Sequence, residues 1–477
     1  MSGIVGTPIF LDRVPDEKNP IPGFSRSYDG EGTVVKRLVA RISRTWRLWT
    51  QQQPEWEGAG AAVADNPRIQ DRETGGKTPM PRKITLRVLL VVCAAIVATG
   101  GYSQSRSEGA SLDHVLHPYL ARYELPALAA AVVTNGKIIA SGAVGTRRAG
   151  TISPVTIDDR FHIGSDTKAM TALIGAMLVD DGRIRWTSSV AEVFPELAAT
   201  MVPDLKGVTL EQLLSHTSGI PSDTEAHEKL IQQSFTQEKL NLDELRYWVI
   251  TQLVAQPVEA TPGTQFAYAN MGYVLAGAML ERVTGQTWEE LIVERVFGPL
   301  ELKTAGLGPQ STLGRVDAPL GHEPRQGNSP KPLLAGPGGD NPEVMGPAGT
   351  AHMSVLDFAR WAGWSAGSGS RGPALVRPDT LRKLHSPVIE MPPKPDAAPG
   401  TPSLGRYGFG LATIRLPFSR EPFLFHGGSN QMNLADIFLQ PDHEFAMVMM
   451  TNVGGRTADD ALKALAVELY NTFGPNP

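Results

Sequence analysis

Ser165 and Lys168 stand three residues apart at the start of an apolar-striped segment. On a helix this spacing puts both side chains one turn apart on the same face, where an amine can reach a hydroxyl oxygen. The first turn also presents unpaired N–H groups and partial positive charge, which favour a developing oxyanion. Together these features predict an acyl-transfer nucleophile. Taken alone, the pair is more typical of an ordinary helix start followed by a surface lysine.

The segment after Ser165 is expected to be the helix that positions this pair. Its apolar residues recur at helical spacing, and Asp180-Asp181-Gly182 follows them. Glycine readily takes the left-handed conformation that ends a helix, so we expect the helix to end at Gly182. The apolar face consists of Ala169, Met170, Leu173, Ile174, Met177 and Leu178.

Composition narrows the classes of function. The chain has 477 residues, of which 41% are hydrophobic and 19% charged, so it can bury a sizeable core. Its net charge of −5 gives no basic footprint for nucleic acid. A single cysteine excludes an intrachain disulfide, and the ten histidines show no metal-binding spacing. We therefore expect no metal and no other cofactor.

The first hundred residues have the composition of leader segments. Residues 1–79 are rich in Pro, Gly and charged residues, which predicts a disordered extension. Residues 80–104 combine Arg82, Lys83 and Arg87 with a short apolar run, as in a signal peptide or signal anchor. Because such a peptide normally begins a protein, we hypothesise that translation starts at Met80. The protein is then exported, periplasmic or extracellular, with membrane association only through residues 84–100.

Residues 108–475 read as one globular α+β domain. A helix over 112–120 precedes two strands joined by Asn135-Gly136, a strong hairpin pattern. Thr209 to Gln212 form a capping box in a helical middle region. These patterns predict an antiparallel sheet built from both ends of the domain, with flanking helices and an all-helical subdomain. The other expected segments are strands 127–133, 137–142, 407–414, 423–425, 433–439 and 445–450, a closing helix 459–470, and long loops 308–345 and 386–405.

Two further motifs follow the first pair in order, namely Tyr268-Ala269-Asn270 and His426-Gly427-Gly428. With Ser165-x-x-Lys168 they resemble the serine β-lactamase and penicillin-binding-protein superfamily, most closely its class C-related branch. That branch includes class C β-lactamases, D-alanyl-D-alanine carboxypeptidases and β-lactamase-like esterases. The resemblance covers about residues 108–475 and implies a β-lactamase/transpeptidase-like α/β sandwich. Residues 214–219 and Pro347-Ala348-Gly349 are further matches.

The resemblance also implies catalytic roles. Ser165 becomes the acylated nucleophile and Lys168 its base, which requires the lysine pKa to fall from ~10.4 to near 7. Tyr268 passes the proton to the leaving group and activates the deacylating water, while Asn270 orients Lys168 and holds a substrate amide. The alternatives are that Tyr268 is a buried aromatic residue and that Asn270 is a helix N-cap.

The resemblance implies an oxyanion hole as well, made by the backbone N–H groups of Ser165 and Ser429 beside Gly428. His426 and Gly427 depart from the Lys-Thr-Gly or Lys-Ser-Gly of efficient β-lactam hydrolases. A histidine charged only below about pH 6.5 replaces a permanent cation that binds a substrate carboxylate. The alternative is that His426 is an ordinary strand-end histidine.

This departure favours an esterase or amidase that acts through an acyl-enzyme on a small ester, amide or peptide of low acidity. Two alternatives stay open at this point. One is a true class C-like β-lactamase or D-alanyl-D-alanine carboxypeptidase. The other is a penicillin-binding sensor or scaffold that is acylated without turnover.

Overall fold

The computed structural model describes residues 109–237, 240–324, 329–334 and 339–475. The extension predicted over 1–79 and the signal segment predicted over 80–104 lie outside these residues. Within the described ranges, no helix combines the length and the apolar character that crossing a membrane requires.

A nine-stranded sheet is the centre of the domain, in the order β1-β3-β2-β14-β13-β12-β11-β10-β9. Neighbouring strands pair antiparallel except β1, which runs parallel to β3. Because β14 pairs with β2, the last strand of the chain joins the first hairpin. The prediction of one sheet built from both ends of the domain is therefore confirmed. The strands are β1 (Ala110–Ser111), β2 (Ala127–Thr134), β3 (Lys137–Gly145), β9 (Ile389–Glu390), β10 (Arg406–Tyr407), β11 (Ala412–Ile414), β12 (Phe423–Ser429), β13 (Leu434–Gln440) and β14 (Phe445–Thr451).

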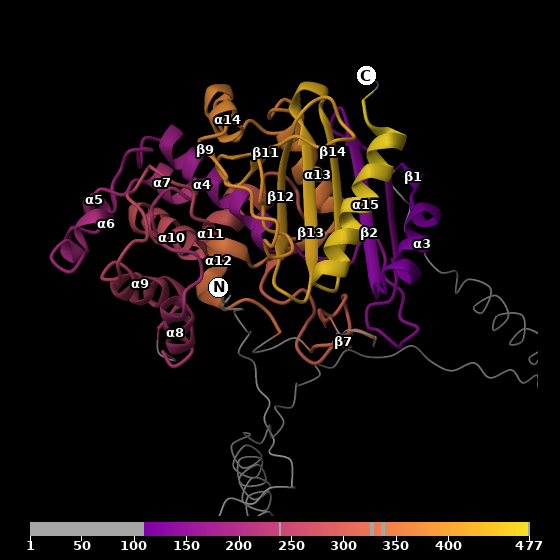
Figure 1. The fold of residues 1–477 in the computed structure, drawn as a ribbon, viewed down its shortest axis with the longest axis horizontal. Helices are drawn as coiled ribbons and strands as arrows, with labels where there is room; N and C mark the ends of the chain where they lie inside the picture. The colour runs from indigo at the N-terminus through magenta and orange to yellow at the C-terminus, as the bar shows by residue number, and fades with distance from the viewer. Residues whose placement is uncertain (1–108, 238–239, 325–328, 335–338, 476–477) are drawn as a thin grey trace, which may run out of the picture. The chain divides into compact units, whose positions relative to one another are not determined.

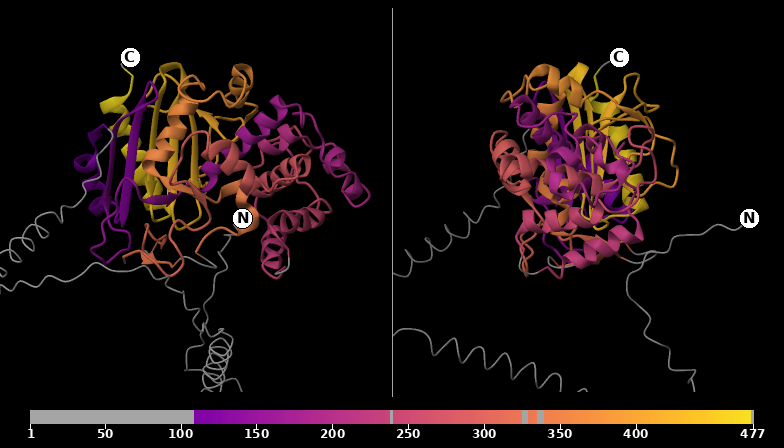
Figure 2. Two further views of the ribbon diagram at one scale, coloured as in Figure 1. Left: turned by 180° about the vertical axis from the view of Figure 1, so that it is seen from behind. Right: turned by 90° about the vertical axis from the view of Figure 1, so that its left-hand side faces the viewer.

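Each face of the sheet carries its own hydrophobic core. Side chains of a strand alternate between faces, so Ala129 and Ala131 of β2 enter one core while Leu128 and Val132 enter the other. Helices α3 (Asp113–Arg122) and α15 (Arg456–Phe473) cover one face, and α13 (Val355–Ala366) covers the opposite face (Figures 1 and 2). The result is a three-layer sandwich of helix, sheet and helix.

A helical region lies beside the sheet, as the sequence predicts (Figure 1). Its central helices are α4 (Thr167–Asp180) and α10 (Asn270–Thr284), which are buried over most of their length and pack on each other. Shorter helices surround them: α5 (Val190–Val193), α6 (Pro203–Lys206), α7 (Leu210–Leu214), α8 (Glu225–Ser234), α9 (Leu242–Leu253), α11 (Trp288–Ile292), α12 (Gly346–Gly349) and α14 (Pro378–Leu384).

Several local predictions are confirmed. Asn135 and Gly136 both have positive φ, as the tight β2–β3 hairpin requires. Gly182, with φ of 70°, follows the end of α4. At the start of α7, the Thr209 hydroxyl accepts from the Gln212 N–H and the Gln212 side chain accepts from the Thr209 N–H, which completes the predicted capping box.

Two local predictions need correction. Residues 407–414 do not form one strand, because Gly410 has φ of 77° and the Gly408 N–H bonds the Leu411 carbonyl, which turns β10 back onto β11. The loops 308–345 and 386–405 are also not free of regular structure. The first contains β6 (His322–Glu323), β7 (Lys331–Pro332) and the 3₁₀ turn η4 (Glu343–Met345), and the second contains β9. Strands of two residues are too short to produce an alternating pattern.

Two short strands complete the surroundings of the nucleophile. β4 (Arg160–His162) pairs antiparallel with β8 (Ala351–Ser354), which also pairs with β5 (Gly306–Leu307). β4 leads directly into the 3₁₀ turn η1 (Gly164–Asp166) and then into α4. The serine-bearing turn is therefore held from both sides, by this small sheet and by the helical region.

Candidate active site

Ser165 lies half-buried in η1, and Lys168 is fully buried in the first turn of α4. The Lys168 Nζ is 2.9 Å from the Ser165 Oγ. Local helical geometry thus produces the contact that the spacing predicts.

Among the described residues, the Lys168 amine contacts three oxygens. Its Nζ lies 2.8 Å from the Asn270 Oδ1 and 2.7 Å from the Ala348 carbonyl oxygen, in addition to the Ser165 hydroxyl. The amide and carbonyl oxygens can only accept. A neutral amine has two hydrogens, which these two oxygens take, so its lone pair is left for the Ser165 hydroxyl. The arrangement suits a base aimed at Ser165.

Burial lowers the pKa of Lys168 to about 7. Desolvation penalises the ammonium form, and the nearby Asp223 carboxylate offsets only part of that penalty. Since Asp166 is itself buried, its own pKa is raised well above the usual range, and its neutral form gives Lys168 little charge support. A substantial fraction of Lys168 is uncharged at neutral pH.

Tyr268 contacts the same two side chains. It is hydrogen-bonded to Ser165, and the Lys168 Nζ lies 4.9 Å from the centre of its ring. Burial raises the pKa of the phenol well above 10, so Tyr268 keeps its proton at neutral pH. His216 packs against this ring at a centroid distance of 4.3 Å, and its Nδ1 accepts from the Ala269 N–H. His216 thereby holds the segment that carries Tyr268 and Asn270.

Asn270 is the first residue of α10 rather than its N-cap, which is Ala269. Its side chain spans the site instead of capping the helix. The Oδ1 faces Lys168, and the Nδ2 donates to both carboxylate oxygens of Asp223 at 3.0 and 3.2 Å. Asp223 is exposed and orients the amide of Asn270. Asp223 was not predicted from the sequence, because a single exposed aspartate in a helical region forms no motif.

The backbone of β12 lies against the serine-bearing turn. A Cβ added to Gly164 would lie 2.3 Å from the Ser429 nitrogen, and one added to Gly428 would lie 2.8 Å from the Ser165 nitrogen. Only residues without a side chain allow this approach. The two nitrogens expected to form an oxyanion hole therefore belong to backbone segments in direct contact.

The sequence predicts that His426 is charged below about pH 6.5, and the structure contradicts this prediction. The His426 side chain is completely buried, with Nε2 3.1 Å from the Tyr407 hydroxyl and Nδ1 2.6 Å from the Gly427 carbonyl. Burial, together with the nearby Lys168 charge, lowers its pKa to about 3. His426 is therefore neutral at all physiological pH values and gives a substrate carboxylate no cation.

Further polar residues behind the nucleophile were not predicted. The His162 Nε2 lies 2.8 Å from the Asp340 Oδ1, and its Nδ1 accepts from the Gly164 N–H. The Ala348 carbonyl that holds Lys168 was also missed, because backbone groups leave no pattern in a sequence. The described residues contain no group of three or more His, Cys, Asp or Glu side chains arranged to hold a metal ion.

A comparison with protein families decides the classification. The β-lactamase family model matches residues 112–472, which is most of the chain. The chain belongs to the serine β-lactamase and penicillin-binding-protein superfamily. Ser165, Lys168, Tyr268 and Asn270 all lie inside the matched range.

Several relatives share this superfamily. Penicillin-binding protein 4 of Amycolatopsis lactamdurans is 28% identical over 359 residues, covering 74% of this chain and 88% of the relative. Protein flp of Staphylococcus aureus strain MW2 is 23% identical over 360 residues, or 76% of this chain, and the chain spans only 66% of that protein's length.

Solved structures agree with the superfamily fold. The octameric penicillin-binding protein homologue from Pyrococcus abyssi matches with a TM-score of 0.59 and 25% identity, over 75% of this chain and 76% of that one. A D-stereospecific amidohydrolase from Streptomyces sp. matches in fold with a TM-score of 0.56 and 22% identity, over 76% of this chain and 98% of that one. The predicted α+β, β-lactamase/transpeptidase-like architecture is thus confirmed.

Proposed function

We propose that this protein is a serine hydrolase that cleaves an ester or amide bond through a covalent acyl-enzyme on Ser165. The observation that carries the proposal is the buried Lys168 amine, 2.9 Å from the Ser165 hydroxyl and held by two oxygens that only accept. This is the geometry of a nucleophile with an adjacent base.

In the acylation step, neutral Lys168 takes the proton of Ser165 as the Oγ attacks the substrate carbonyl carbon. The carbonyl oxygen becomes an oxyanion, which the N–H groups of Ser165 and Ser429 stabilise. Tyr268, hydrogen-bonded to Ser165, passes the proton taken up by Lys168 to the leaving alcohol or amine. The bond to the leaving group then breaks and the acyl-enzyme remains.

Deacylation repeats these events with water. Lys168 and Tyr268 take a proton from the attacking water, whose oxygen bonds the acyl carbon. The ester bond to Ser165 breaks, the Ser165 oxygen recovers a proton, and a carboxylic acid is released. The same residues therefore serve both halves of the reaction.

The charges around the nucleophile favour substrates that lack a carboxylate. His426 is neutral, and Gly427 has no hydroxyl to replace the missing cation. Asp223, exposed beside Asn270, adds a negative charge near the nucleophile. An anionic substrate would meet repulsion here, whereas a neutral or amine-bearing ester or amide would not. These charges support an esterase or amidase over a β-lactamase or D-alanyl-D-alanine carboxypeptidase.

Covalent labelling tests the nucleophile. A fluorophosphonate probe should modify the wild-type protein at Ser165, and Ser165→Ala should lose labelling while keeping the wild-type melting temperature. Ser370→Ala is the matched control, since it removes an exposed serine hydroxyl that donates to the Gly367 carbonyl and has no part in the candidate site. Labelling of Ser165→Ala at the wild-type rate would place the nucleophile elsewhere.

A pair of substrates distinguishes the proposed function from its alternatives. We expect steady turnover of a short-chain nitrophenyl ester and negligible cleavage of a chromogenic cephalosporin. Efficient cephalosporin hydrolysis would instead indicate a β-lactamase. A single stoichiometric burst without turnover would indicate a penicillin-binding sensor.

We also propose that the protein is exported, a hypothesis that rests on the sequence of residues 80–104 alone. N-terminal sequencing of the protein purified from its native cells tests it. A mature chain that begins after this segment supports export, and a chain that retains residues before Met80 contradicts the hypothesis.

A further inference from the structure

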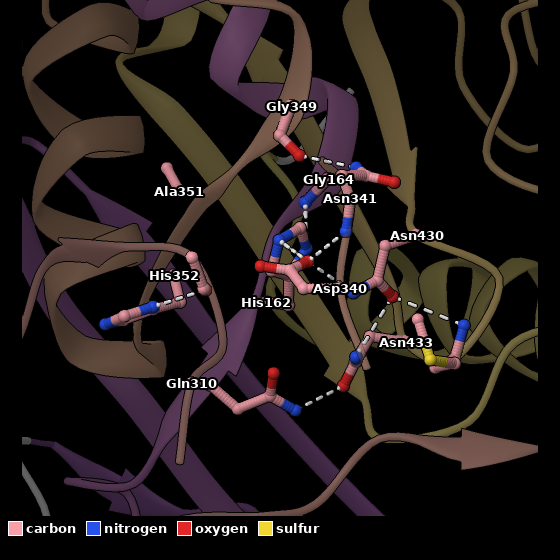
Figure 3. A network of polar contacts seen from close by, with 12 residues as sticks. His162, Gly164, Gln310, Asp340, Asn341, Gly349, Ala351, His352, Asn430 and Asn433 are labelled. Atoms are coloured by element: carbon pink, nitrogen blue, oxygen red, sulfur yellow. Dashed lines mark hydrogen bonds and ion pairs between the residues drawn. The ribbon is translucent and has the colours of Figure 1, made fainter. Parts of the chain in front are cut away.

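A connected polar network surrounds Asp340 (Figure 3). None of the catalytic steps above uses it. Its centre is Asp340, whose side chain is 5% exposed, in the connection between β7 and η4. Three groups converge on a single carboxylate oxygen of this residue, Oδ1. They are the His162 Nε2 at 2.8 Å, the Asn430 Nδ2 at 3.0 Å and the Asn341 N–H at 2.7 Å.

One branch of the network leads to Ser165. The His162 ring is fully buried, and its Nδ1 accepts from the Gly164 N–H at 3.0 Å. An acceptor nitrogen carries no hydrogen, so the ring hydrogen of neutral His162 is on Nε2, facing Asp340. Asp340 therefore sets the orientation of the ring that holds the backbone just before Ser165.

The second branch leads to Ser429. Asn430 follows this residue directly, and its Oδ1 accepts from the Met432 N–H and the Asn433 Nδ2. The Ser429 hydroxyl donates to the Asn433 carbonyl at 2.8 Å. The turn after β12 is thus closed on itself and tied to Asp340 through the Asn430 amide.

A third branch leads toward Lys168. The Asn341 Nδ2 donates to the Gly349 carbonyl at 2.6 Å, next to Ala348, whose carbonyl holds the lysine. Asp340 and Asn341 are neighbours in the chain. One short segment is therefore connected by polar contacts to the backbone before Ser165, to the turn after β12 and to the residue beside Ala348.

We infer that Asp340 is the positioning residue that fixes the two N–H donors of the oxyanion hole relative to each other. The donors lie on segments more than 260 residues apart in the chain, and the Oδ1 of Asp340 bridges those segments through His162 and Asn430. A hole of this kind acts only if both donors are preorganised around the developing charge. This inference rests on the function proposed above.

The charge state of Asp340 fits this role. Burial alone would raise its pKa, but His162, Asn430 and the Asn341 N–H together hold the pKa of the carboxyl below its usual range. A carboxylate that receives several hydrogen bonds is a strong acceptor and a rigid anchor. Its charge is therefore retained at every pH at which the site would work.

The experiment compares Asp340→Asn and Asp340→Ala with the wild type. Asparagine keeps an oxygen that can accept from His162, Asn430 and Asn341, but it loses the negative charge that strengthens these hydrogen bonds, whereas alanine removes all three contacts. With a nitrophenyl ester we expect kcat to fall roughly 10- to 100-fold, the scale of a misplaced reacting geometry, and further for alanine. KM should stay within about twofold, because ground-state binding does not use the oxyanion hole.

The affinity for phenylboronic acid distinguishes a positioning role from a general loss of stability, which would leave this affinity of the folded protein unchanged. Phenylboronic acid adds to a serine as a tetrahedral anion, so its affinity reports how well the hole is preorganised. The affinity should fall by about the same factor as kcat/KM in each variant. His162→Asn, which keeps an acceptor near the Nδ1 position, should retain more activity than His162→Ala.

Asp180→Asn is the matched control. Asp180 lies at the opposite end of α4, and its carboxylate accepts from the Arg377 N–H and side chain and from the Thr380 hydroxyl. This variant loses a similar set of hydrogen bonds far from Ser165, so its kcat and boronate affinity should stay within about twofold of wild type. The melting temperature of each variant shows that the compared proteins are folded.

The outcomes are distinct. Any of three results would overturn the positioning role of Asp340. These are a kcat of Asp340→Asn within twofold of wild type, a fall in kcat/KM that comes from KM alone, and an unchanged boronate affinity. If the alanine variant does not fold, Asp340→Asn and Asn430→Ala carry the test by the same criteria. A wild-type protein with no labelling of Ser165 and no boronate binding would overturn the proposed function, and this inference with it.

Discussion

Lys168 has a lowered pKa and a lone pair directed at Ser165, and both properties follow from its burial at the start of a helix. Burial lowers its pKa to about 7, and the Asn270 and Ala348 oxygens leave only its lone pair for Ser165. A surface lysine at the same spacing would keep a pKa near ~10.4 and would be almost fully protonated at neutral pH. At the residue scale, then, desolvation turns a common sequence pair into a candidate base.

The pH dependence of acylation follows from this pKa. Below it Lys168 is protonated and cannot accept the Ser165 proton, so kcat/KM for an uncharged ester should rise with pH through a midpoint near 7. Asp223 raises the pKa of Lys168, so Asp223→Asn should move the midpoint to lower pH. Initial rates from pH 5 to 9 measure both effects. A profile without a midpoint between pH 6 and 8 would exclude Lys168 as the base.

Burial also determines the protonation state of Asp166. Both of its carboxylate oxygens are buried without a hydrogen-bond partner, and its pKa is raised well above the usual range by burial and by the nearby Asp436. We expect Asp166 to be neutral in the working protein. Asp166→Asn, an uncharged near-isostere, should therefore keep kcat/KM within about threefold. Replacement by asparagine that abolished activity at unchanged stability would contradict this assignment.

At the element scale, the site depends on how closely β12 approaches η1. Gly428 of β12 lies against Ile163 so closely that an added Cβ would be 1.8 Å from the Ile163 carbonyl oxygen. No side-chain rotation can relieve this contact, because the backbone of residue 428 fixes the position of the Cβ and the other partner is a backbone carbonyl. The strand and the serine-bearing turn can keep their distance only if position 428 is glycine.

Gly428→Ala should therefore push the two elements apart. A displacement of about 1 Å at reacting groups costs on the order of 10²-fold in rate, so we expect at least that loss of kcat/KM together with a lower melting temperature. Gly207→Ala is the matched control, since nothing lies within 4 Å of its added Cβ. Steady-state kinetics and thermal unfolding measure the effects. Near wild-type kinetics for Gly428→Ala would show that this approach is not required.

At the scale of the whole molecule, the sheet separates two cores, and charged groups are buried on the face that α15 covers. Asp436 of β13 is 2% exposed there, and burial and the nearby Asp459 raise its pKa to about 8. The folded protein therefore holds this proton to much higher pH than the unfolded chain, whose aspartates titrate near ~3.9. The stability that comes from holding the proton is fully present below that value and is lost as pH rises through about 8.

Asp436→Asn should remove this pH dependence. The melting temperature of Asp436→Asn minus that of the wild type should increase as pH rises from 5 to 8.5. Only the wild type loses the stability that comes from holding a proton at this position. The opposite pH dependence that Lys168 contributes is common to both proteins and cancels in the difference. A melting-temperature difference that is constant over this range would show that Asp436 titrates normally.

Much of the architecture was predictable because it depends on neighbours in the chain. The Asn135-Gly136 hairpin, the Thr209 capping box and the end of α4 just before Gly182 each use contacts within a few residues. The broken strand at Gly410 was not predicted, since its apolar run resembles a continuous strand and only the packing of Gly410 against Ala169 explains the turn.

By itself, the sequence determined that Ser165 and Lys168 can meet, because helical geometry fixes the reach between residues three positions apart. It also determined the family motifs and the sheet formed from both ends of the domain. Only the tertiary structure decided that Lys168 titrates near neutral pH and that His426 stays neutral, since both depend on burial. The tertiary structure likewise brought Asp223 into contact with Asn270 and Asp340 into contact with His162. Contacts between segments so distant in the chain arise from packing, which no local pattern of residues encodes.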